Sequence, residues 1–458
     1  MPASGDPPPD LMPTRVLEIS TPGRVRLKVC GSNEQGRYAC LSYCWGKNSH
    51  RQLRTTKDTL IEHQKGIEWN QLPRTFQEAL ILTYKLGLRY LWIDSLCIVQ
   101  DDLEDWRTEG GKMADIYAHS YMTFAATNSM DSKGGLCNPL PRGELCTVDT
   151  ADGPFKVRIL QEYNSSPYRS SMPLMQRAWF FQEQILAPRI VYFAQYELFW
   201  KNVNTTICEC CELDKELPPL GDSNPHHLQN LNNYERMSWW HNTVEAYTKL
   251  RLTFEYDIFP ALQGIAHITQ QTRKCDYYAG LWADTFVQDM LWIAIRPGKR
   301  PSSNTYRAPT WSWASIVGTI AYMSSYSLSI HVTVLSKSTV PVGESELGQL
   351  KGGYATLRGP CTVFDITTCR RFPYMLDYLR CRYSLLHLDV RYKYNYNRIL
   401  FMHTADCCVR ASHTSMVFLL YRCIDEQKRI YERVGLWQVE DPDQGGLPDL
   451  LEMEITVV

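Results

Sequence analysis

The stretch from Leu72 to Asp102, LPRTFQEALILTYKLGLRYLWIDSLCIVQDD, constrains the fold more than any other part of this chain. Apolar residues recur at helical spacing through its first half, and Gly87 stands where a helix would end. Thr75 and Glu78 have the spacing of a capping box near the start of that helix. The first half therefore predicts an amphipathic helix over residues 72–86.

A short run of β-forming residues, LRYLWI at 88–93, follows this helix and predicts a buried strand. The chain becomes acidic directly after it, at Asp94, Asp101 and Asp102. Carboxylates at the carboxyl end of a strand stand where α/β proteins place their binding and catalytic groups. The unit of helix, turn and strand therefore predicts an α/β domain with a site near Asp94.

The segments on either side continue this alternation. Runs rich in β-branched and aromatic residues predict strands at 25–29, 38–43, 121–126 and 189–194, and helical spacing predicts helices at 104–120 and 176–187. We expect the first of these helices to break or begin near Gly110 and Gly111. Strands that alternate with helices pair in parallel through right-handed crossovers. The sequence therefore predicts a Rossmann- or flavodoxin-like α/β fold, an open parallel sheet with helices on both faces.

Changes in composition divide the chain into three parts. Five of the first 13 residues are proline, and we expect residues 1–24 to form a flexible N-terminal arm. We predict the α/β domain over residues 25–215 and a separate C-terminal region over residues 216–458, which begins in a Pro- and Asn-rich stretch. Helices are expected there at 234–252, 259–269 and 278–292, followed by short strands of an antiparallel sheet or small barrel. The C-terminal region is thus expected to be α-helical first and then β-rich.

Composition and charge exclude several classes of protein. The chain has 458 residues, of which 44% are hydrophobic, which suggests two or three domains. A formal net charge of -1 offers no basic field for nucleic acid. The N-terminus lacks the pattern of a secretory signal, and no apolar run of about 18 residues occurs. We therefore expect a cytoplasmic protein that neither binds nucleic acid nor spans a membrane, with its 16 cysteines mostly as buried thiols.

The predicted sheet would gather three polar clusters at the carboxyl ends of its strands. These clusters are Tyr43, Trp45 and Gly46; Asp94, Ser95 and Gln100; and Arg177, Trp179, Gln182 and Glu183. Their aromatic rings, carboxylates and guanidinium are the groups that a small charged ligand would need. We therefore take them together as the candidate site.

Common signatures of other sites are absent from the sequence. It has no dinucleotide-binding G-x-G-x-x-G, no P-loop, no zincin H-E-x-x-H and no esterase G-x-S-x-G. The motif ICECCE at 207–212 has one C-x-x-C spacing without a second well-spaced pair, so we predict no metal site. Cys97 and His119 could form a thiol-imidazole pair, but the apolar LCIV around Cys97 favours a core residue.

Four separated motifs resemble one known family. They are YACLSYCWG at 38–46, LPRTFQEAL with LGLRYLWIDSLCIVQDD, MADIYAHSYMTFAAT, and RAWFFQEQILAPRIVYF at 177–193. In this order they resemble the HET domain of fungal heterokaryon-incompatibility proteins. The resemblance implies an intracellular fungal protein that acts in non-self recognition and triggers programmed cell death, together with an incompatibility partner or sensor protein.

The HET family also resembles TIR domains, which have a flavodoxin-like sheet and in some cases cleave NAD through one glutamate on a helix. In this sequence the matching residue is Glu183 in WFFQEQ. The resemblance implies NAD as a substrate, no bound cofactor, and a catalytic role for Glu183. Asp94 is a second catalytic candidate, because its carboxylate could orient the ribose or a catalytic water. Trp45 or Trp92 could stack on a ring of the substrate, and Arg177 could bind a phosphate.

Simpler roles for the same residues remain open. Glu183 could pair with Arg177 or Arg189, and Asp94 could cap the turn after its strand. Tryptophans 45, 92 and 179 could be core residues. In that case the protein would be a non-enzymatic scaffold that self-associates, as a homo-oligomer, and recruits partners.

Overall fold

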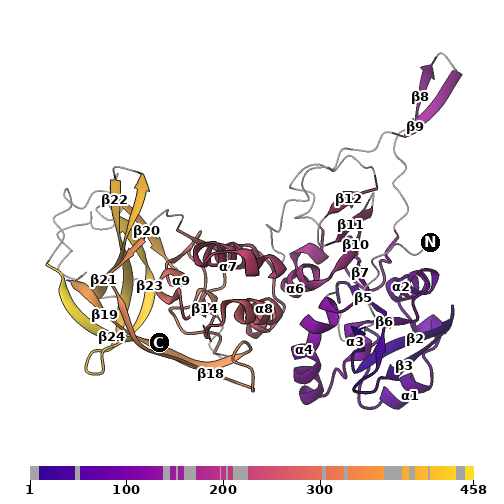
Figure 1. Cartoon of the computed structure of the whole chain (residues 1–458), viewed down its shortest axis with the longest axis horizontal. Helices are drawn as coiled ribbons and strands as arrows, with labels where there is room; N and C mark the ends of the chain where they lie inside the picture. The colour runs from indigo at the N-terminus through magenta and orange to yellow at the C-terminus, as the bar shows by residue number, and fades with distance from the viewer. Residues whose placement is uncertain are drawn as a thin grey trace. The chain divides into compact units, whose positions relative to one another are not determined.

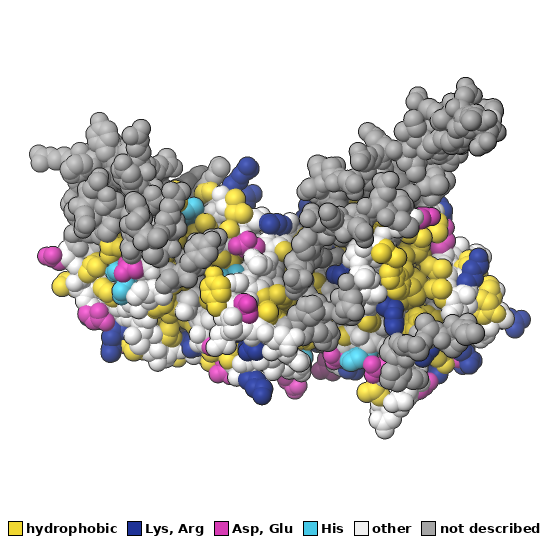
Figure 2. All heavy atoms as spheres, turned by 45° about the horizontal axis from the view of Figure 1, so that its top comes forward, with side chains coloured by type: hydrophobic (Ala, Val, Ile, Leu, Met, Phe, Trp, Pro, Cys, Tyr) yellow, Lys and Arg dark blue, Asp and Glu magenta, His cyan; other side chains and the backbone are white. Residues whose placement is uncertain are grey.

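The computed structural model of the chain divides it into two compact units, residues 1–225 and 226–458 (Figure 1). It describes residues 10–46, 52–137, 145–150, 153–158, 172–195, 198–202, 205–209, 225–301, 306–323, 328–365, 384–390, 398–410, 413–439 and 449–458. Among the helices of this described part, none is long and apolar enough to cross a bilayer. Figure 2 shows basic and acidic side chains interspersed over the face in view.

The first unit is built on a mixed sheet of eight strands. These are β2 (Arg15–Thr21), β3 (Arg24–Val29), β5 (Tyr38–Ser42), β6 (Tyr90–Trp92), β7 (Met122–Ala125), β10 (Arg189–Phe193), β11 (Leu198–Asn202) and β12 (Thr206–Cys208). Their order in the sheet is β12-β11-β10-β7-β5-β6-β2-β3. The four central strands β10, β7, β5 and β6 run parallel, and the strands outside them pair antiparallel.

Helices connect the parallel strands. They are α1 (Leu60–Lys65), α2 (Arg74–Lys85), α3 (Asp94–Cys97), α4 (Leu103–Ala118) and α6 (Ala178–Leu186), with the 3-10 turns η2 (Trp69–Gln71) and η3 (Leu174–Gln176). Helix α2 packs on β2 and β6, whereas α4 and α6 pack on each other on the other side of the sheet (Figure 1). Two small pairs complete the unit: β1 (Asp10–Leu11) with β4 (Gln35–Gly36), and β8 (Leu145–Thr150) with β9 (Gly153–Arg158).

Every residue of β5 and β7 is buried, because helices cover both faces of the sheet at its centre. An apolar cluster between the sheet and helix α6 includes Ala125, Phe180, Ile190, Tyr192 and Phe199. The prediction of an α/β domain is therefore confirmed, whereas the predicted open parallel sheet is instead a mixed one.

Three details differ from the predictions. The sheet is mixed, since its outer strands are antiparallel, and residues of the expected N-terminal arm form strand β2 between β3 and β6. Helix α4 runs without a break through Gly110 and Gly111. Its N-cap, Asp102, accepts hydrogen bonds from two backbone amides, and its apolar face is buried, so packing outweighs the helix cost of the two glycines.

The predicted capping box is wrong. Helix α2 begins one residue after Pro73, and no side chain caps it. Thr75 instead accepts a hydrogen bond from the amide of Gly135, at 2.9 Å. Glu78 accepts from the amides of Leu136 and Cys137, at 2.6 and 3.1 Å. Both side chains therefore bind the loop after β7, which is distant from helix α2 in the sequence.

The second unit begins with helices and continues as strands. Its helices are α7 (Asn233–Tyr247), α8 (Gln263–Arg273) and α9 (Phe286–Asp289). Its 3-10 turns are η4 (Pro225–Asn230), η5 (Glu255–Ile258), η6 (Pro260–Leu262) and η7 (Trp313–Ser315). Two short strand pairs are β13 (Tyr277–Tyr278) with β14 (Leu281–Trp282), and β15 (Trp292–Ala294) with β16 (Ile320–Tyr322). The larger strands are β17 (Leu328–Ile330), β18 (Thr333–Pro341), β19 (Leu350–Asp365), β20 (Ser384–Leu388), β21 (Arg398–Arg410), β22 (His413–Asp425), β23 (Ile430–Val439) and β24 (Leu451–Val457). These eight form one sheet, in which the pairing of β19 with β21 closes a ring of strands.

Of the helix predicted at 278–292, only the short α9 at Phe286–Asp289 is present. The chain there makes a tight hairpin at Ala279 and Gly280, which have φ values of 48° and 93°. A Cβ at Gly280 would lie 2.3 Å from the indole nitrogen of Trp313, so the turn needs a glycine. Trp282 then packs edge-on against Trp240, with 5.2 Å between ring centroids. Burial of these aromatic rings outweighs the helical periodicity of the segment.

Candidate functional site

The first part of the candidate site is the end of strand β5. Ser42 and Tyr43 are buried there, whereas Trp45 and Gly46 are half-buried. Gly46 has a φ of 81°, a value that favours glycine, and the chain turns at this point. The Tyr43 ring packs edge-on against Phe76 of α2, with 5.0 Å between centroids. The turn thus leaves the indole of Trp45 beside the end of the neighbouring strand β6.

Asp94, directly after β6, is the next part. Its Oδ2 accepts a hydrogen bond from Trp45 Nε1 at 2.7 Å, and its Oδ1 accepts from the amide of Ser95 at 2.6 Å. The Tyr43 hydroxyl donates to the same carboxylate. Burial raises the pKa of Asp94 above its ordinary value, against the effect of these donors and of the Arg177 guanidinium. Asp94 therefore links the ends of β5 and β6.

Helix α6 supplies the third part. Arg177, at its N-cap, donates to the backbone carbonyl of Tyr43. Glu183, in the second turn, is only 7% exposed and lies beside the hydroxyls of Ser42 and Tyr117. Burial raises its pKa to about 7. The negative charge of Asp94 contributes to this rise, and the two hydroxyls and Arg177 oppose it.

Seven side chains therefore meet at this edge of the sheet, and we call them the carboxylate cluster: Ser42, Tyr43, Trp45, Asp94, Tyr117, Arg177 and Glu183. Trp45, Asp94 and Arg177 keep part of their surface exposed, and the other four are buried. The cluster thus has a partly exposed rim and a buried carboxyl that is partly ionised near neutral pH.

The other predicted site residues take different positions. Trp92 has no exposed surface and packs edge-on against Tyr117, with 5.7 Å between centroids, so it supports the cluster from within the core. Gln182 is also buried, and Trp179 is half-buried on α6. Gly46 contributes its backbone turn. Of the predicted set, the structure therefore brings together Tyr43, Trp45, Asp94, Arg177 and Glu183.

Sequence analysis missed Ser42 and Tyr117. Ser42 lies within the motif YACLSYCWG as the last residue of a buried strand, where its hydroxyl gave no signal. Tyr117 lies on the buried face of α4 with Met113 and Ile116, a pattern that indicates packing. Only the packing of α4 against α6 shows that the Tyr117 hydroxyl reaches Glu183.

Among the described residues of the first unit, the sequence candidates outside this cluster give no second site. Cys97 is buried, and burial raises the pKa of its thiol to about 12, so it is not activated. His119 Nε2 lies 4.0 Å from Oδ2 of Asp10, and both side chains are exposed. Cys208 is buried at the end of β12, and the other two cysteines of ICECCE lie outside the described residues.

A hollow of about 640 Å³ lies in the second unit, lined by residues of α7, α9 and β16. His241 Nε2 lies 2.8 Å from Oδ1 of the fully buried Asp289, and its ring stacks on Tyr322 with 3.6 Å between centroids. Asp289 Oδ2 accepts from the Trp282 amide and the Thr285 hydroxyl, at 2.8 and 3.0 Å. Asp289 thus fixes the imidazole of His241 in the wall of this hollow.

The fold and the cluster define the first unit as a mixed α/β domain with a carboxylate site at the carboxyl ends of its parallel strands. Residues 38–183 match the family described as Heterokaryon incompatibility protein (HET), so the chain carries a HET domain over this range. The match runs from the first residue of β5 to Glu183 and contains the whole carboxylate cluster. It indicates involvement in heterokaryon incompatibility. Comparisons with curated proteins and with solved structures gave no match.

Proposed function

We propose that the protein is a cytoplasmic effector of fungal non-self recognition and programmed cell death, and that its HET domain cleaves NAD at the carboxylate cluster. The observation that carries this proposal is Glu183, a carboxyl whose pKa is raised to about 7 beside Arg177 and two hydroxyls. Perturbed carboxyls of this kind are typical of catalytic sites. An incompatibility partner or a sensor protein would activate the effector.

The order of the central strands supports a TIR-like site. In chain order, the parallel strands β5, β6, β7 and β10 are arranged 2-1-3-4 across the sheet. In flavodoxin-like sheets of this order, ligands bind outside the carboxyl ends of the first and third strands. The cluster lies at the carboxyl end of β5, the first of these strands. NAD bound there would contact the same edge of the sheet.

Cleavage of NAD requires few catalytic groups from the protein. Water replaces nicotinamide at C1′ of the ribose, and the products are nicotinamide, ADP-ribose and one proton. Nicotinamide leaves as a neutral molecule, so no general acid is required, and one carboxylate can stabilise the positive charge that develops on the ribose. Glu183 would supply that carboxylate, and Asp94 would orient the ribose or the water. Trp45 would stack on a ring of NAD, and Arg177 would bind a phosphate.

One observation favours the alternative, a non-enzymatic scaffold. Glu183 is 7% exposed, and the hydroxyls of Ser42 and Tyr117 already lie beside its carboxyl. In this second candidate function the cluster only holds α6 against the sheet, and exposed surfaces of the protein recruit partners or a second copy of the chain. Self-association would then be required for toxicity, whereas NAD consumption would not.

The experiment that separates the two functions measures nicotinamide release from NAD by the purified full chain. We expect release by the wild type and a loss of about 100-fold or more in Glu183→Gln, because the variant keeps the shape of the side chain and removes its negative charge. Circular dichroism of both proteins checks that the variant is folded.

Glu109→Gln is the matched control. Glu109 is another buried glutamate, 2% exposed, and it binds Thr14 and Lys112 outside the cluster. Its variant should keep the wild-type rate. Equal nicotinamide release from folded Glu183→Gln would contradict the catalytic role, and toxicity of that variant in the absence of NAD loss would favour the scaffold.

A further inference from the structure

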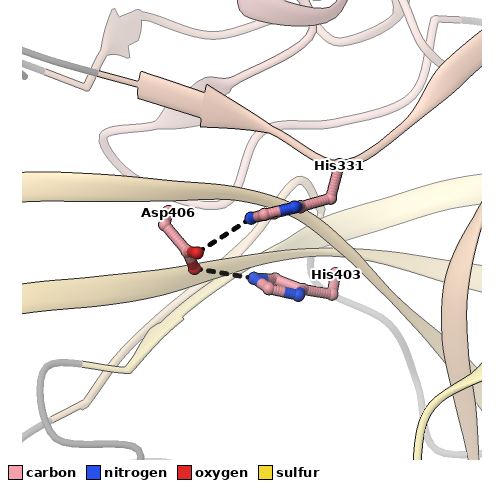
Figure 3. A group of neighbouring side chains, drawn as sticks. All are labelled: His331, His403 and Asp406. Atoms are coloured by element: carbon pink, nitrogen blue, oxygen red, sulfur yellow. Dashed lines mark hydrogen bonds and ion pairs between the residues drawn. The ribbon is translucent and has the colours of Figure 1, made fainter.

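Three side chains that can bind a metal ion converge on the closed sheet of the second unit (Figure 3). His331 Nε2 lies 2.8 Å from Oδ2 of Asp406, and His403 Nε2 lies 2.8 Å from Oδ1 of the same carboxylate. The two imidazole rings lie side by side, with 4.5 Å between centroids. The three ligand atoms all lie within 4.8 Å of one another. Two nitrogens and one carboxylate oxygen therefore face a common point.

A β-bulge explains how His403 and Asp406 share a face of β21. Residues three apart in a regular strand point to opposite faces. Here His403 pairs with Phe418 and Ala405 pairs with Val417, so Thr404 is the extra residue of the bulge. The Thr404 hydroxyl accepts a hydrogen bond from the amide of Leu419, at 3.3 Å, which pins the bulge to β22.

Strand pairing also places His331. Ile330 of β17 pairs with Ala405, so the next residue, His331, points to the opposite face, which is that of Asp406. The amide of His331 donates to the carbonyl of Thr404 at 3.0 Å. Backbone hydrogen bonds thus fix all three residues before any ion binds.

We propose that His331, His403 and Asp406 bind one divalent transition-metal ion of the zinc class. Imidazole nitrogens suit Zn²⁺ and its neighbours, whereas Ca²⁺ and Mg²⁺ require oxygen ligands. Three tetrahedral ligands at about 2.1 Å from Zn²⁺ are about 3.4 Å apart. Here each imidazole nitrogen lies 2.8 Å from a carboxylate oxygen, and all three ligand atoms lie within 4.8 Å of one another. The ion would bind each histidine at Nε2, the nitrogen that now faces the carboxylate, and each neutral imidazole would then carry its proton on Nδ1.

The site is open to solvent on one side. The side chains of His331, His403 and Asp406 are 31%, 9% and 29% exposed, so an ion can reach them. His403 packs against Phe418, with 5.1 Å between ring centroids, which gives the site one apolar wall. Three protein ligands leave a coordination position for water or another ligand, as in zinc sites that act on bound molecules.

The test is a calorimetric titration of the chelator-treated full chain with Zn²⁺. Because the chain has 16 cysteines, the readout is the difference in binding between variant and wild type. We expect one class of site in the wild type that is weakened about tenfold or more in His331→Ala and in Asp406→Asn. His331 lies between β17 and β18, outside both strands, so His331→Ala should fold.

His267→Ala is the control, because His267 is an exposed histidine of the same unit that contacts Gln271, 2.9 Å away. It should bind Zn²⁺ as the wild type does. Co²⁺ in place of Zn²⁺ adds a visible spectrum that reports nitrogen and oxygen ligands, and this spectrum should disappear in Asp406→Asn. Wild-type affinity in both cluster variants would overturn the proposal, as would a wild type that binds no Zn²⁺.

Discussion

Gly46 shows how a single residue shapes the carboxylate cluster. It carries the chain out of β5 with a φ of 81°, and a Cβ at this position would lie only 2.7 Å from the Cβ of Asp131. The turn at Gly46 follows directly after Trp45, whose indole binds Asp94. A side chain at this position would therefore strain the backbone and collide with the loop after β7.

We predict that Gly46→Ala lowers the free energy of unfolding by about 2 kcal/mol or more. Urea denaturation measures this change. The control is Gly111→Ala, at an exposed position of α4 with no atom within 4 Å of the added Cβ. That variant should instead be stabilised by about 0.5–1 kcal/mol, because alanine favours the helix. Equal effects of the two substitutions would refute the role of Gly46.

Glu183 should make the stability of the protein depend on pH. Burial raises its pKa to about 7 in the folded chain, from an ordinary value of 4.5. The folded state therefore binds the proton more tightly than the unfolded state. The stabilisation is complete below about pH 4.5 and is lost as the pH rises through about 7, a change on the order of 3 kcal/mol.

We therefore predict that the wild type loses stability relative to Glu183→Gln as the pH rises from about 5 to about 8. Urea denaturation of both proteins across this range measures the difference. The variant lacks the titrating carboxyl, so the difference between the unfolding free energies of the two proteins should change with pH. Parallel pH profiles would show that Glu183 titrates normally in the folded protein.

At the scale of elements, Arg433 joins strand β23 to the segment that follows α9. Its side chain has no exposed surface, donates to the carbonyls of Met290 and Trp292, and lies over the Trp292 ring at 3.6 Å from the centroid. Its Nε lies 3.2 Å from Oδ2 of Asp389, which is also fully buried. Loss of the guanidinium would leave a buried carboxyl and two carbonyls without this partner.

We predict that Arg433→Met destabilises the second unit by about 3–5 kcal/mol, the range found when one partner of a buried ion pair is removed. Thermal unfolding measures the effect. Arg358→Met is the control, because Arg358 pairs with Glu454 on the surface, where both side chains are about half exposed. It should cost about 0–1 kcal/mol. A similar small loss in both variants would contradict the structural role of Arg433.

At the scale of the whole molecule, the two proposals belong to different units. The carboxylate cluster and the HET match lie within residues 1–225, whereas the three metal-binding residues lie within residues 226–458. Each unit has its own sheet and its own apolar core. Failure of NAD cleavage would therefore not count against the metal site, and failure of zinc binding would not count against Glu183.

Sequence patterns predicted those parts of the molecule that depend on nearby residues. The periodicity from Leu72 to Leu86 marked helix α2, and Gly87 followed its end with a φ of 75°. Strands β5, β6, β7 and β10 were expected from short apolar runs, and the sites at their carboxyl ends followed from the alternation with helices. Asp94, Arg177 and Glu183 could be proposed on these grounds because local sequence decides where strands and helices end.

Tertiary structure alone decided the rest, because the contacts involved join residues far apart in the chain. The Tyr117 hydroxyl meets Glu183 only when α4 packs on α6, and Thr75 and Glu78 bind a loop about 60 residues away instead of capping α2. His403 and Asp406 share a face only because one residue bulges out of β21, and His331 joins them through pairing with a third strand. Sequence periodicity predicts which face of its own helix or strand a residue lies on. The residues that it contacts in other elements depend on how those elements pack in the tertiary structure.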